Sequence, residues 1–398
     1  MGALTGVRVL DLTNVLSGPF CTLHIALLGA EVVKIENPKA GDLARVLGNV
    51  PKLNKMLMGT SFLAQNANKK SVTLNLKAPE GKEVFKKLVA KADVVVENFR
   101  PDVMTRLGLG YPVLAGINPR LVYCGISGFG QTGPDADKPA YDQIIQGLSG
   151  EMDVNGDERL HPLRAGFPVC DTVGGLNAAF AIMAALYHRE KTGEGQMIDV
   201  ALLDSIMPLM GWVAANLLIG GQGPIAMGND NFTAAPSGSF ATQDGHVNIA
   251  ANKQEQWEAM AEVIGAPELK TDPRFQERDE RKKNRKALTP LVEEKLKQKP
   301  TAFWVDALNA KDVPSGDILS LKAALAQPQV EHRKVLHPVK VDDEIGEVRL
   351  FGLTAQLSKT PGEITSPPPR LGAHTEEVLL GLGYSKTDVA SLKEKGIA

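Results

Sequence analysis

The sequence of 398 residues has few cysteines and few aromatic residues, and its charges nearly cancel. The three cysteines, Cys21, Cys124 and Cys170, are odd in number, and no two of them have the spacing of metal ligands. A disulfide framework is therefore not expected, which favours a reducing compartment, and we expect a cytoplasmic protein. With a formal net charge of −2, the chain has no overall basic field that would attract nucleic acid or an anionic membrane.

Long hydrophobic runs are also missing. The N-terminus lacks a basic segment followed by an extended apolar core, so no signal peptide is predicted. The longest apolar stretch, residues 202–219, contains Asp204, Ser205, Pro208 and Asn216. A membrane span needs about 20 predominantly apolar residues, so this stretch is predicted to be a buried helical segment.

The common phosphate, nucleophile and metal motifs are absent as well. Residues 128–133 match the pattern GxGxxG, but the segment that follows, residues 134–139 (PDADKP), is not expected to begin the helix that a dinucleotide site requires. There is no GxxxxGK[ST] loop and no GxSxG elbow, and the seven histidines show no HExxH pattern. The sequence therefore predicts no metal and no bound cofactor.

What is present is an alternation of strand and helix patterns along the first 130 residues. Apolar, β-branched runs at 7–12, 31–35, 93–96 and 120–126 predict strands, and an apolar stripe along 81–91 predicts an amphipathic helix. This alternation is typical of an α/β fold in which helices cover a parallel sheet. Because a single core rarely exceeds about 250–300 residues, a chain of this length predicts two domains.

The pattern changes after Gly220. Residues 220–224 (GGQGP) form a flexible break. Beyond it, residues 238–251 predict a β-hairpin with Asp244-Gly245 in its turn, and residues 270–299 predict charged helices with solvated faces. This part of the chain is therefore predicted to form a smaller α+β domain.

A long helix rich in glycine and alanine is predicted over residues 172–189. Asp171 stands at its start, where free N–H groups and the positive end of the helix dipole favour an ionised carboxylate. From the residues alone, Asp171 is either a helix N-cap or a nucleophile. Cys170 is a rival nucleophile, but it has no basic neighbour in sequence and is interpreted as structural. Gly174 and Gly175 allow either close helix packing or close approach of a substrate to the backbone.

Four groups of segments follow one another along the chain. They contain LDLTNVLSGP and LLGAEVVKIENPKAGDLAR (10–45), NKKS, LNLK and VVVENFRPDVMTRLGL (68–109), RAGFPVCDTVGG and TGEGQMIDVALLDS (164–205), and PRLGAHT (369–375). Together they resemble the class III CoA-transferases, a family also named CaiB/BaiF. The resemblance covers essentially the whole chain and is weakest between residues 206 and 330.

The resemblance implies a Rossmann-like large domain, a smaller α+β domain and an interlocked homodimer. In this family the chain passes from the large domain to the small one and returns. On that basis we expect a first part of the large, CoA-binding domain over 1–205, a linker over 206–228, the small domain over 229–330, and a return linker with the C-terminal part of the large domain over 331–398.

The resemblance also implies an activity, the transfer of CoA between carboxylic acids with Asp171 as the covalent nucleophile. An ionised carboxylate would attack the thioester and form a mixed anhydride, and CoA would then be exchanged through the same aspartyl group. The expected partners are an acyl-CoA and a small carboxylic acid, without nucleic acid or membrane. This chemistry requires no metal or redox cofactor.

Coenzyme A is a large anion, so its site should contain cations and backbone amides. By position in the family motifs, the residues expected to bind it are Val15, Leu16, Leu74, Lys77, Asn98, Phe99, Arg106 and Lys138. The chain departs from formyl-CoA relatives at two places. Asn37-Pro38 stands where they have a basic residue, and Leu16 stands where they have glutamine, which puts the adenine contacts and the polarity of the site in doubt.

Many relatives act on small dicarboxylates, and the second carboxylate of such a substrate favours an arginine fork. The donor is expected to resemble succinyl-CoA, and the acceptor to be a C4–C6 acid of the itaconate, mesaconate or glutarate type. Residues 229–232 (NDNF), early in the small domain, are a candidate loop for reaching the acyl group. The candidates for holding the substrate carboxylate are Arg45, Arg100, Arg164 and Tyr141.

Two alternatives come from other classes of function. An α-methylacyl-CoA racemase would share the fold and the aspartate but needs a second proton carrier, usually a histidine before an aspartate. This chain has Tyr141-Asp142 at that place, and tyrosine, with a pKa near ~10, is a poor base at neutral pH. A CoA-binding scaffold with an inactive site would not need Asp171 and its neighbouring glycines, and thioester hydrolysis is a third activity that the same site could support.

Overall fold

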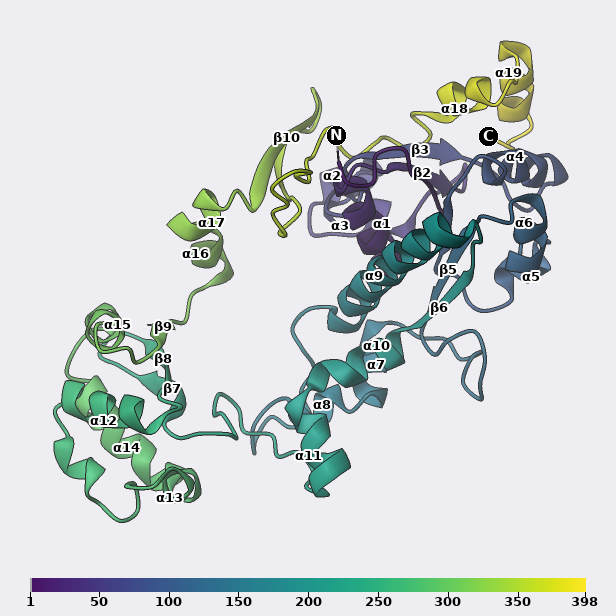
Figure 1. Cartoon of the computed structure of the whole chain (residues 1–398). Helices are drawn as coiled ribbons and strands as arrows, with labels where there is room; N and C mark the ends of the chain where they lie inside the picture. Colours follow the sequence, from purple (N-terminus) through teal and green to yellow (C-terminus); the bar gives the residue numbers. More distant parts are fainter. Residues whose placement is uncertain (1) are drawn as a thin grey trace. The chain divides into compact units, whose positions relative to one another are not determined.

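The computed structural model describes residues 2–398, and the chain divides into two compact units (Figure 1). Unit 1 contains residues up to Glu151, Arg164–Gly223 and Glu331–Ala398, and unit 2 contains Met152–Leu163 and Pro224–Val330. The chain thus leaves unit 1 twice. Nothing in the sequence pattern marked the short first excursion, residues 152–163, as part of the smaller unit.

A six-stranded parallel sheet forms the centre of unit 1, in the order β3-β2-β1-β4-β5-β6. This is the strand order of doubly wound dinucleotide-binding folds, in which the direction of winding reverses between β1 and β4. The predicted α/β fold with a parallel sheet is therefore confirmed. The strands are β1 (Arg8–Asp11), β2 (Glu31–Glu36), β3 (Lys69–Thr73), β4 (Val94–Glu97), β5 (Val122–Ser127) and β6 (Met197–Ala201).

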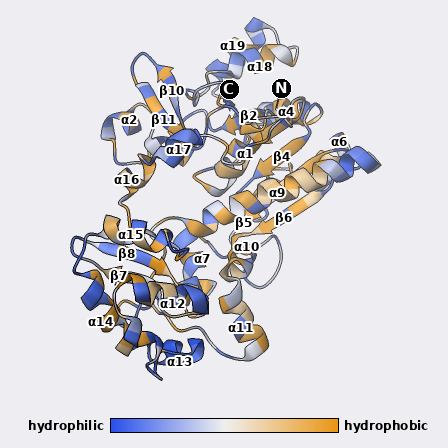
Figure 2. Ribbon diagram, turned by 60° about the vertical axis from the view of Figure 1, so that its left-hand side comes forward, coloured by the Kyte–Doolittle hydropathy of each residue, from blue (hydrophilic) through white to orange (hydrophobic). Residues whose placement is uncertain are grey.

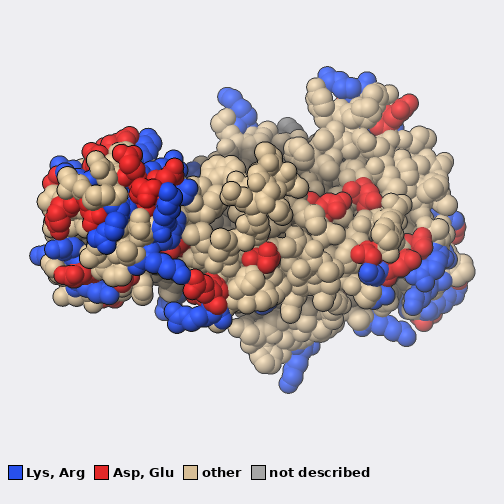
Figure 3. All heavy atoms as spheres, turned by 90° about the horizontal axis from the view of Figure 1, so that it is seen from below, with Lys and Arg blue, Asp and Glu red and all other residues tan. Residues whose placement is uncertain are grey.

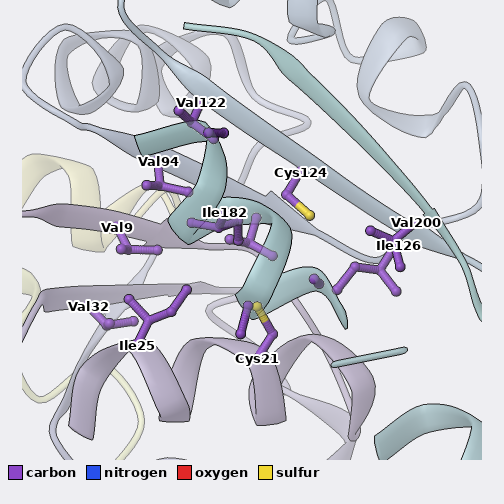
Figure 4. Close-up of a cluster of buried hydrophobic side chains, with 14 of the residues drawn as sticks. Val9, Cys21, Ile25, Val32, Val94, Val122, Cys124, Ile126, Ile182 and Val200 are labelled. Atoms are coloured by element: carbon purple, nitrogen blue, oxygen red, sulfur yellow. The ribbon is translucent and has the colours of Figure 1, made fainter. Parts of the chain in front are cut away.

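Helices cover both faces of this sheet. On one face, α1 (Ser17–Leu27) and α9 (Val169–Thr192) pack against each other and against strand residues such as Val9 and Val94 (Figure 4). The strands are apolar on both faces, as a sheet buried between helix layers requires. The other face is covered by α4 (Pro79–Val89), α5 (Val103–Arg106), α6 (Tyr111–Ile117), α18 (Thr375–Gly381) and α19 (Lys386–Glu394).

Shorter elements complete unit 1 and the segments of chain where it passes into unit 2. An antiparallel hairpin packs beside α1 through Val339 and Leu350. The remaining elements are η1 (Leu43–Val46), α2 (Pro51–Lys55), α3 (Thr60–Leu63), α7 (Asp142–Leu148), α8 (Glu151–Val154), α10 (Leu202–Ile206), η2 (Met207–Met210), α11 (Trp212–Gly220), α17 (Pro328–His332), β10 (Leu336–Asp342) and β11 (Gly346–Phe351).

The prediction of a buried helical segment over residues 202–219 is wrong for most of its length. The segment breaks at Gly211, where the chain bends by 82° between α10–η2 and α11. None of the residues of α11 is buried, and Ile219 is 88% exposed. The apolar character of the segment thus marks an uncovered surface rather than a core, and α11 is coloured as hydrophobic in Figure 2.

The edge strand β3 does not have an open hydrogen-bonding edge, because the C-terminal segment binds it. The Asn68 N–H donates to Ser366 O, and the Ser71 N–H donates to His374 Nδ1. The Thr73 N–H donates to Thr375 Oγ1 at 3.0 Å. The segment PRLGAHT near the end of the chain therefore closes the sheet edge, which otherwise favours pairing with another chain.

Unit 2 is built on a three-stranded antiparallel sheet of β7 (Ser237–Ala241), β8 (His246–Ala250) and β9 (Ser315–Asp317). The predicted hairpin is confirmed, with Asp244 and Gly245 in the turn between β7 and β8. Helices pack on this sheet around the buried Trp257. They are α12 (Gln254–Val263), η3 (Pro267–Lys270), α13 (Arg278–Lys283), α14 (Arg285–Leu296) and α15 (Thr301–Asn309). Helix α16 (Leu321–Leu325) follows β9 and has no buried residue.

Charge is distributed unevenly over the surface. In Figure 3, charged side chains of both signs crowd unit 2, whereas broad parts of unit 1 on the viewed face carry few. By length and composition, α9 could span a membrane, and so could the bent pair α10–η2 and α11 if taken as one span. One side of α9, with Ala178, Ile182 and Ala185, packs in the core, which gives its apolar character a structural role.

Candidate active site

A cavity of about 320 Å³ opens where the strands of unit 1 end. It is lined by the loop after β1 (residues 14–17), the loop after β4 (98–101), the end of β5 (126–128) and the first turn of α9. The strand order reverses between β1 and β4, and ligands in open parallel sheets bind outside the carboxyl ends of the strands at such a reversal. The topology therefore marks this cavity as a ligand site before any side chain is considered.

Asp171 is the one acidic residue that lines this cavity among residues 2–398. It lies in the first turn of α9, which begins at Val169, three residues earlier than predicted. Pro168 occupies the N-cap position, so the interpretation of Asp171 as the N-cap is wrong. Its carboxylate accepts no hydrogen bond and forms no ion pair within the described chain.

A second carboxylate determines the electrostatics of Asp171. The Cys170 and Asp171 N–H groups donate to Asp142 Oδ1, at 2.8 and 3.3 Å. Gln146 Nε2 donates to Asp142 Oδ2 at 2.6 Å. Burial is the larger cause, and the negative charge of Asp142 the smaller one, of a rise in the pKa of Asp171 to about 7.

The expectation that the helix N-terminus holds Asp171 ionised is thus not met. The free N–H groups of the first turn are there, but those of residues 170 and 171 donate to the carboxylate of Asp142 instead of that of Asp171. Asp142 therefore takes the stabilisation that the helix end offers an anion. Asp171 consequently titrates close to neutral pH.

Cys170 does not compete as a nucleophile. Its side chain is fully buried, and burial together with the charge of Asp142 raises the pKa of the thiol to about 12. A thiol rather than a thiolate is present at neutral pH, and the thiol is a poor nucleophile. The interpretation of Cys170 as a structural residue agrees with this environment.

Gly174 and Gly175 serve packing. A Cβ atom on Gly175 would lie 2.4 Å from Ser17 O, and one on Gly174 would lie 2.3 Å from Leu202 Cδ2. Both glycines are buried in α9. Of the two interpretations that the sequence left open, these contacts support close helix packing. The absence of a side chain at Gly175 allows α9 to lie close to the start of α1.

All but one of the residues expected to bind CoA line one of two cavities. Val15, Leu16, Asn98 and Lys138 line the cavity of Asp171. Leu74 and Lys77 line a neighbouring cavity of about 240 Å³, and Phe99 and Asn14 line both. Arg106 lines neither cavity and ends α5 on the surface, although its neighbours Val103 and Leu107 line the second one.

The second cavity has largely apolar walls with a polar rim. Leu12, Ile35, Leu76 and Leu107 contribute to its walls, together with Phe99. Asn37, one of the two residues that replace the basic position of formyl-CoA relatives, lies at this cavity with Asn75 and Glu36. Of the two departures from the family pattern, the one at Asn37 is therefore located at this cavity, whereas Leu16 lines the cavity of Asp171.

The four candidates for holding a substrate carboxylate have different surroundings. Arg100 and Tyr141 line the cavity with Asp171, and both are exposed to solvent. Arg45 is fully buried, and its guanidinium donates to both oxygens of Glu36, at 2.7 and 2.8 Å. Arg164 is exposed and lines none of the cavities described here.

Sequence reasoning overlooked several residues at this site. Ser127 and Gly128 line the cavity because they end β5, and the rule that sites lie at the carboxyl ends of parallel strands could have found them. Leu43 lines it from η1, without a sequence signal. Asp142 was noted only as the partner of Tyr141 in the comparison with racemases, and its contact with α9 joins positions 28 residues apart.

The rejected GxGxxG segment is not followed by a helix. After β5 the chain runs through residues 128–141 without a helix and reaches α7 only at Asp142. The segment therefore lacks the helix N-terminus on which a pyrophosphate would bind. Among residues 2–398, no group of three or more His, Cys, Asp or Glu side chains is arranged to hold a metal ion.

Comparison with known proteins identifies the family. The model of CoA-transferase family III matches residues 4–375. The chain belongs to this family. It is 38% identical to the succinyl-CoA:glutarate CoA-transferase of Mus musculus over 95% of this chain and 86% of that protein. It is 42% identical to the acetyl-CoA:oxalate CoA-transferase of Acetobacter aceti over 84% and 85% of the two chains.

Solved structures of CoA-transferase family III proteins share the fold. A CAIB/BAIF family protein from Brucella suis superposes with a TM-score of 0.84 at 34% identity, over 96% of this chain and 99% of that one. The family thus supplies both the α/β architecture and the class of enzyme, a CoA-transferase acting on an acyl-CoA and a carboxylic acid. The predicted family and enzyme class are confirmed.

Proposed function

We propose that this CoA-transferase moves CoA from succinyl-CoA or a similar donor to a C4–C6 dicarboxylic acid, with Asp171 as the covalent carrier. The observation that carries the proposal is the position of Asp171, a single carboxylate on the wall of a cavity that also contains Arg100 and Lys138. A carboxylate that shares its cavity with Arg100 suits anionic substrates, and Lys138, whose Nζ lies 2.7 Å from Asp135 Oδ1, adds a second cation. Relatives that transfer CoA from succinyl-CoA to glutarate or mesaconate support this choice of acids.

The reaction balances without a cofactor. The Asp171 carboxylate attacks the thioester carbonyl, the C–S bond breaks, and a mixed anhydride and CoA thiolate form. The thiolate attacks the Asp171 carbonyl and releases the donor acid, which leaves an aspartyl-CoA thioester. The acceptor carboxylate then displaces the thiolate to form a second anhydride, and the thiolate attacks the acceptor carbonyl, which regenerates Asp171.

The two cavities suggest how CoA binds. The second cavity, with apolar walls and Lys77 at its rim, suits the adenine ring and a nearby phosphate. The pantetheine arm would pass Asn14 and Phe99, which line both cavities, and bring the thioester to Asp171. We propose this path for CoA, with Arg106 and Lys138 as further phosphate partners.

Trapping the intermediate tests the covalent step. The protein is incubated with succinyl-CoA, treated with hydroxylamine, and digested for peptide mass spectrometry. A hydroxamate on Asp171 is the expected result, and an Asp171→Asn variant is the control that should carry none. Absence of the label, together with solvent deuterium entering the α-carbon of an acyl-CoA, would contradict the transferase mechanism and favour the racemase.

The acceptor site is tested with two arginine variants. We propose that Arg100 binds the distal carboxylate, because of the three candidate arginines it alone lines the cavity of Asp171. An Arg100→Gln variant should raise KM for a dicarboxylate by about tenfold or more, while KM for a monocarboxylate of equal length changes little. An Arg164→Gln variant serves as the matched control, and equal effects in both variants would refute the assignment.

We also propose that the protein is a homodimer, as the family resemblance implied. Helix α9 carries an apolar stripe at helical spacing, Leu176, Phe180, Met183 and Tyr187, on the side that faces away from the sheet. Phe180 is 69% exposed and Tyr187 is 68% exposed. A second copy of the chain would cover this stripe, which otherwise remains in water.

A further inference from the structure

The loop between β1 and α1 has an unusual backbone conformation where it lines the cavity of Asp171. Val15 has a φ of 66°, in the left-handed region that a β-branched residue rarely adopts. Because the conformation is unfavourable for valine, contacts from the rest of the protein must hold it. Val15 and Leu16 both line the cavity with Asp171, so this conformation shapes the site.

A buried aspartate supplies the contact that holds Val15. The Val15 N–H donates to Asp42 Oδ1 at 2.9 Å, and Asp42 lies 27 residues further along the chain. The other oxygen of Asp42 lies 2.9 Å from Lys34 Nζ, and both side chains of this ion pair have no exposed surface. The backbone of Asp42 is held by a further hydrogen bond, because its N–H donates to Glu36 Oε1 at 3.0 Å.

The residues on either side of the strained position are held as well. Lys34 Nζ donates to Thr13 O at 2.7 Å. The Asn14 N–H donates to Asn98 Oδ1, and Asn98 Nδ2 donates back to Asn14 O, at 2.8 and 2.9 Å. Three consecutive loop residues are thus bound by side chains from β2, from the segment after β2 and from the loop after β4. The loop therefore has little freedom to relax into an ordinary conformation.

We infer that Asp42 is a positioning residue of the CoA-transferase reaction. It holds the backbone of Val15, so that Val15 and Leu16 form part of the wall of the cavity in which the acyl-CoA binds. Lys34 positions Asp42 in turn. The inference rests on the proposed function, because it assumes that the cavity binds the acyl-CoA. Asp42 touches no reacting atom, and its effect is transmitted through the backbone of Val15.

Stability alone is a weak explanation for this pair. Two charges without solvent contact lose their hydration, and replacing such a pair by apolar side chains of similar size is often neutral for stability. The pair also fulfils two geometric tasks at once, because Asp42 binds the Val15 N–H and Lys34 binds Thr13 O. Its position beneath a strained loop at a ligand cavity fits a role in setting the loop geometry.

Two double variants separate the hydrogen bond to Val15 from the buried charge. Lys34→Met/Asp42→Asn removes both charges but leaves an acceptor for the Val15 N–H, whereas Lys34→Met/Asp42→Leu removes the acceptor too. We expect the leucine variant to raise KM for succinyl-CoA by about tenfold over the asparagine variant, with a much smaller change in kcat. Calorimetric binding of CoA should weaken by the same factor.

A third substitution distinguishes positioning from a general structural defect. Asp42 also accepts a hydrogen bond from the Ala44 N–H, at 2.8 Å, and leucine would remove this bond as well. Adding Val15→Gly to the leucine variant should restore most of the lost affinity, because glycine adopts a positive φ without strain. Equal KM values in the two double variants, or no recovery with glycine, would overturn the inference.

A further variant keeps the inference testable if the leucine protein does not fold. Val15→Pro leaves the Asp42–Lys34 pair intact but has no N–H and cannot adopt a positive φ. It should weaken CoA binding by about tenfold or more, and unchanged binding would refute the role of the Val15 conformation. If the parent protein binds CoA but transfers none, the proposed function fails, while the calorimetric comparison still decides the role of Asp42.

Discussion

At the scale of single residues, the site combines the proposed nucleophile, Asp171, with a neighbour that opposes its ionisation. Asp142 occupies the N–H groups at the start of α9, and its charge and the burial of the site hold the pKa of Asp171 near 7. A carboxylate with a raised pKa is more basic and hence more nucleophilic once it is ionised. The arrangement thus exchanges a smaller ionised fraction for greater reactivity of each ionised molecule.

The pH dependence of catalysis should report this arrangement. In the proposed mechanism only ionised Asp171 attacks the thioester. We therefore expect kcat/KM for succinyl-CoA to rise with pH and level off above about pH 7, the pKa to which burial and Asp142 raise the Asp171 carboxyl. An Asp142→Asn variant lacks the like charge, so its profile should shift to lower pH. The measurement is kcat/KM from about pH 5 to about pH 9, and a profile unmoved by the substitution would refute the coupling.

Asp171 should also reduce the stability of the fold above neutral pH. Its pKa in the folded protein, about 7, is higher than the ordinary value of 3.8, so folding favours the protonated form. The destabilisation is absent below pH 3.8, grows as pH rises towards 7 and is complete above it. An Asp171→Asn variant, which lacks this charge, should therefore gain free energy of unfolding over the parent as pH rises.

Urea unfolding at two pH values measures this effect. At about pH 8 the asparagine variant should unfold at a higher urea midpoint than the parent, and the difference should shrink towards about pH 4. A difference that is the same at both pH values would show that the change arises from packing and not from the charge.

At the scale of elements, the site depends on how closely α9 approaches α1. The Cβ position of Gly175 is occupied by the backbone oxygen of Ser17, whereas that of Gly174 is occupied by the end of the Leu202 side chain. A backbone oxygen moves only with its chain, and Ser17 itself lines the cavity of Asp171. A leucine side chain can change its rotamer.

Alanine substitutions at the two glycines should therefore have unequal effects. Gly175→Ala should lower the free energy of unfolding by about 1–3 kcal/mol, the range of an overpacked core, and should also weaken CoA binding, because it displaces Ser17. Gly174→Ala is the matched control with a smaller loss. Urea unfolding and calorimetry provide the comparison, and equal losses at both positions would contradict the packing argument.

At the scale of the whole molecule, the apolar stripe of α9 and the exposed helix α11 lack a partner in the described chain. Leu218 and Ile219 are 82% and 88% exposed, values that differ sharply from those of the buried strands. Apolar surface of this extent usually marks an interface. The proposed interface would account for the core-like sequence of α11, none of whose residues is buried.

The oligomeric state tests the assignment of this surface. Light scattering after gel filtration should give twice the chain mass of 42.6 kDa. A Phe180→Glu variant places a charge on the stripe and should shift the protein towards monomer or insoluble protein. Glu190→Gln, on an exposed side chain in the last part of the same helix, is the control and should remain dimeric. A parent protein of monomer mass would refute the proposal.

The sequence by itself determined the fold class and the family, and it singled out Asp171 as the candidate nucleophile. Strand and helix periodicities are local properties, so the sequence alone was sufficient to predict the alternating α/β pattern. The motifs around Asp171 likewise lie within short stretches of chain. The apolar segment 202–219 was misjudged for the same reason. Hydropathy alone does not distinguish an apolar side chain that is buried in the core of its own chain from one that is exposed on the surface.

Only the tertiary structure decided which residues surround Asp171 and in which direction its pKa is shifted. Arg45 and Arg100 are alike in sequence, yet the fold binds Arg45 to Glu36 and leaves Arg100 at the cavity. Asp142 reaches α9 across 28 residues. Such contacts join segments that are remote along the chain, and electrostatic interactions depend on distance and burial in space, neither of which is encoded in local sequence patterns.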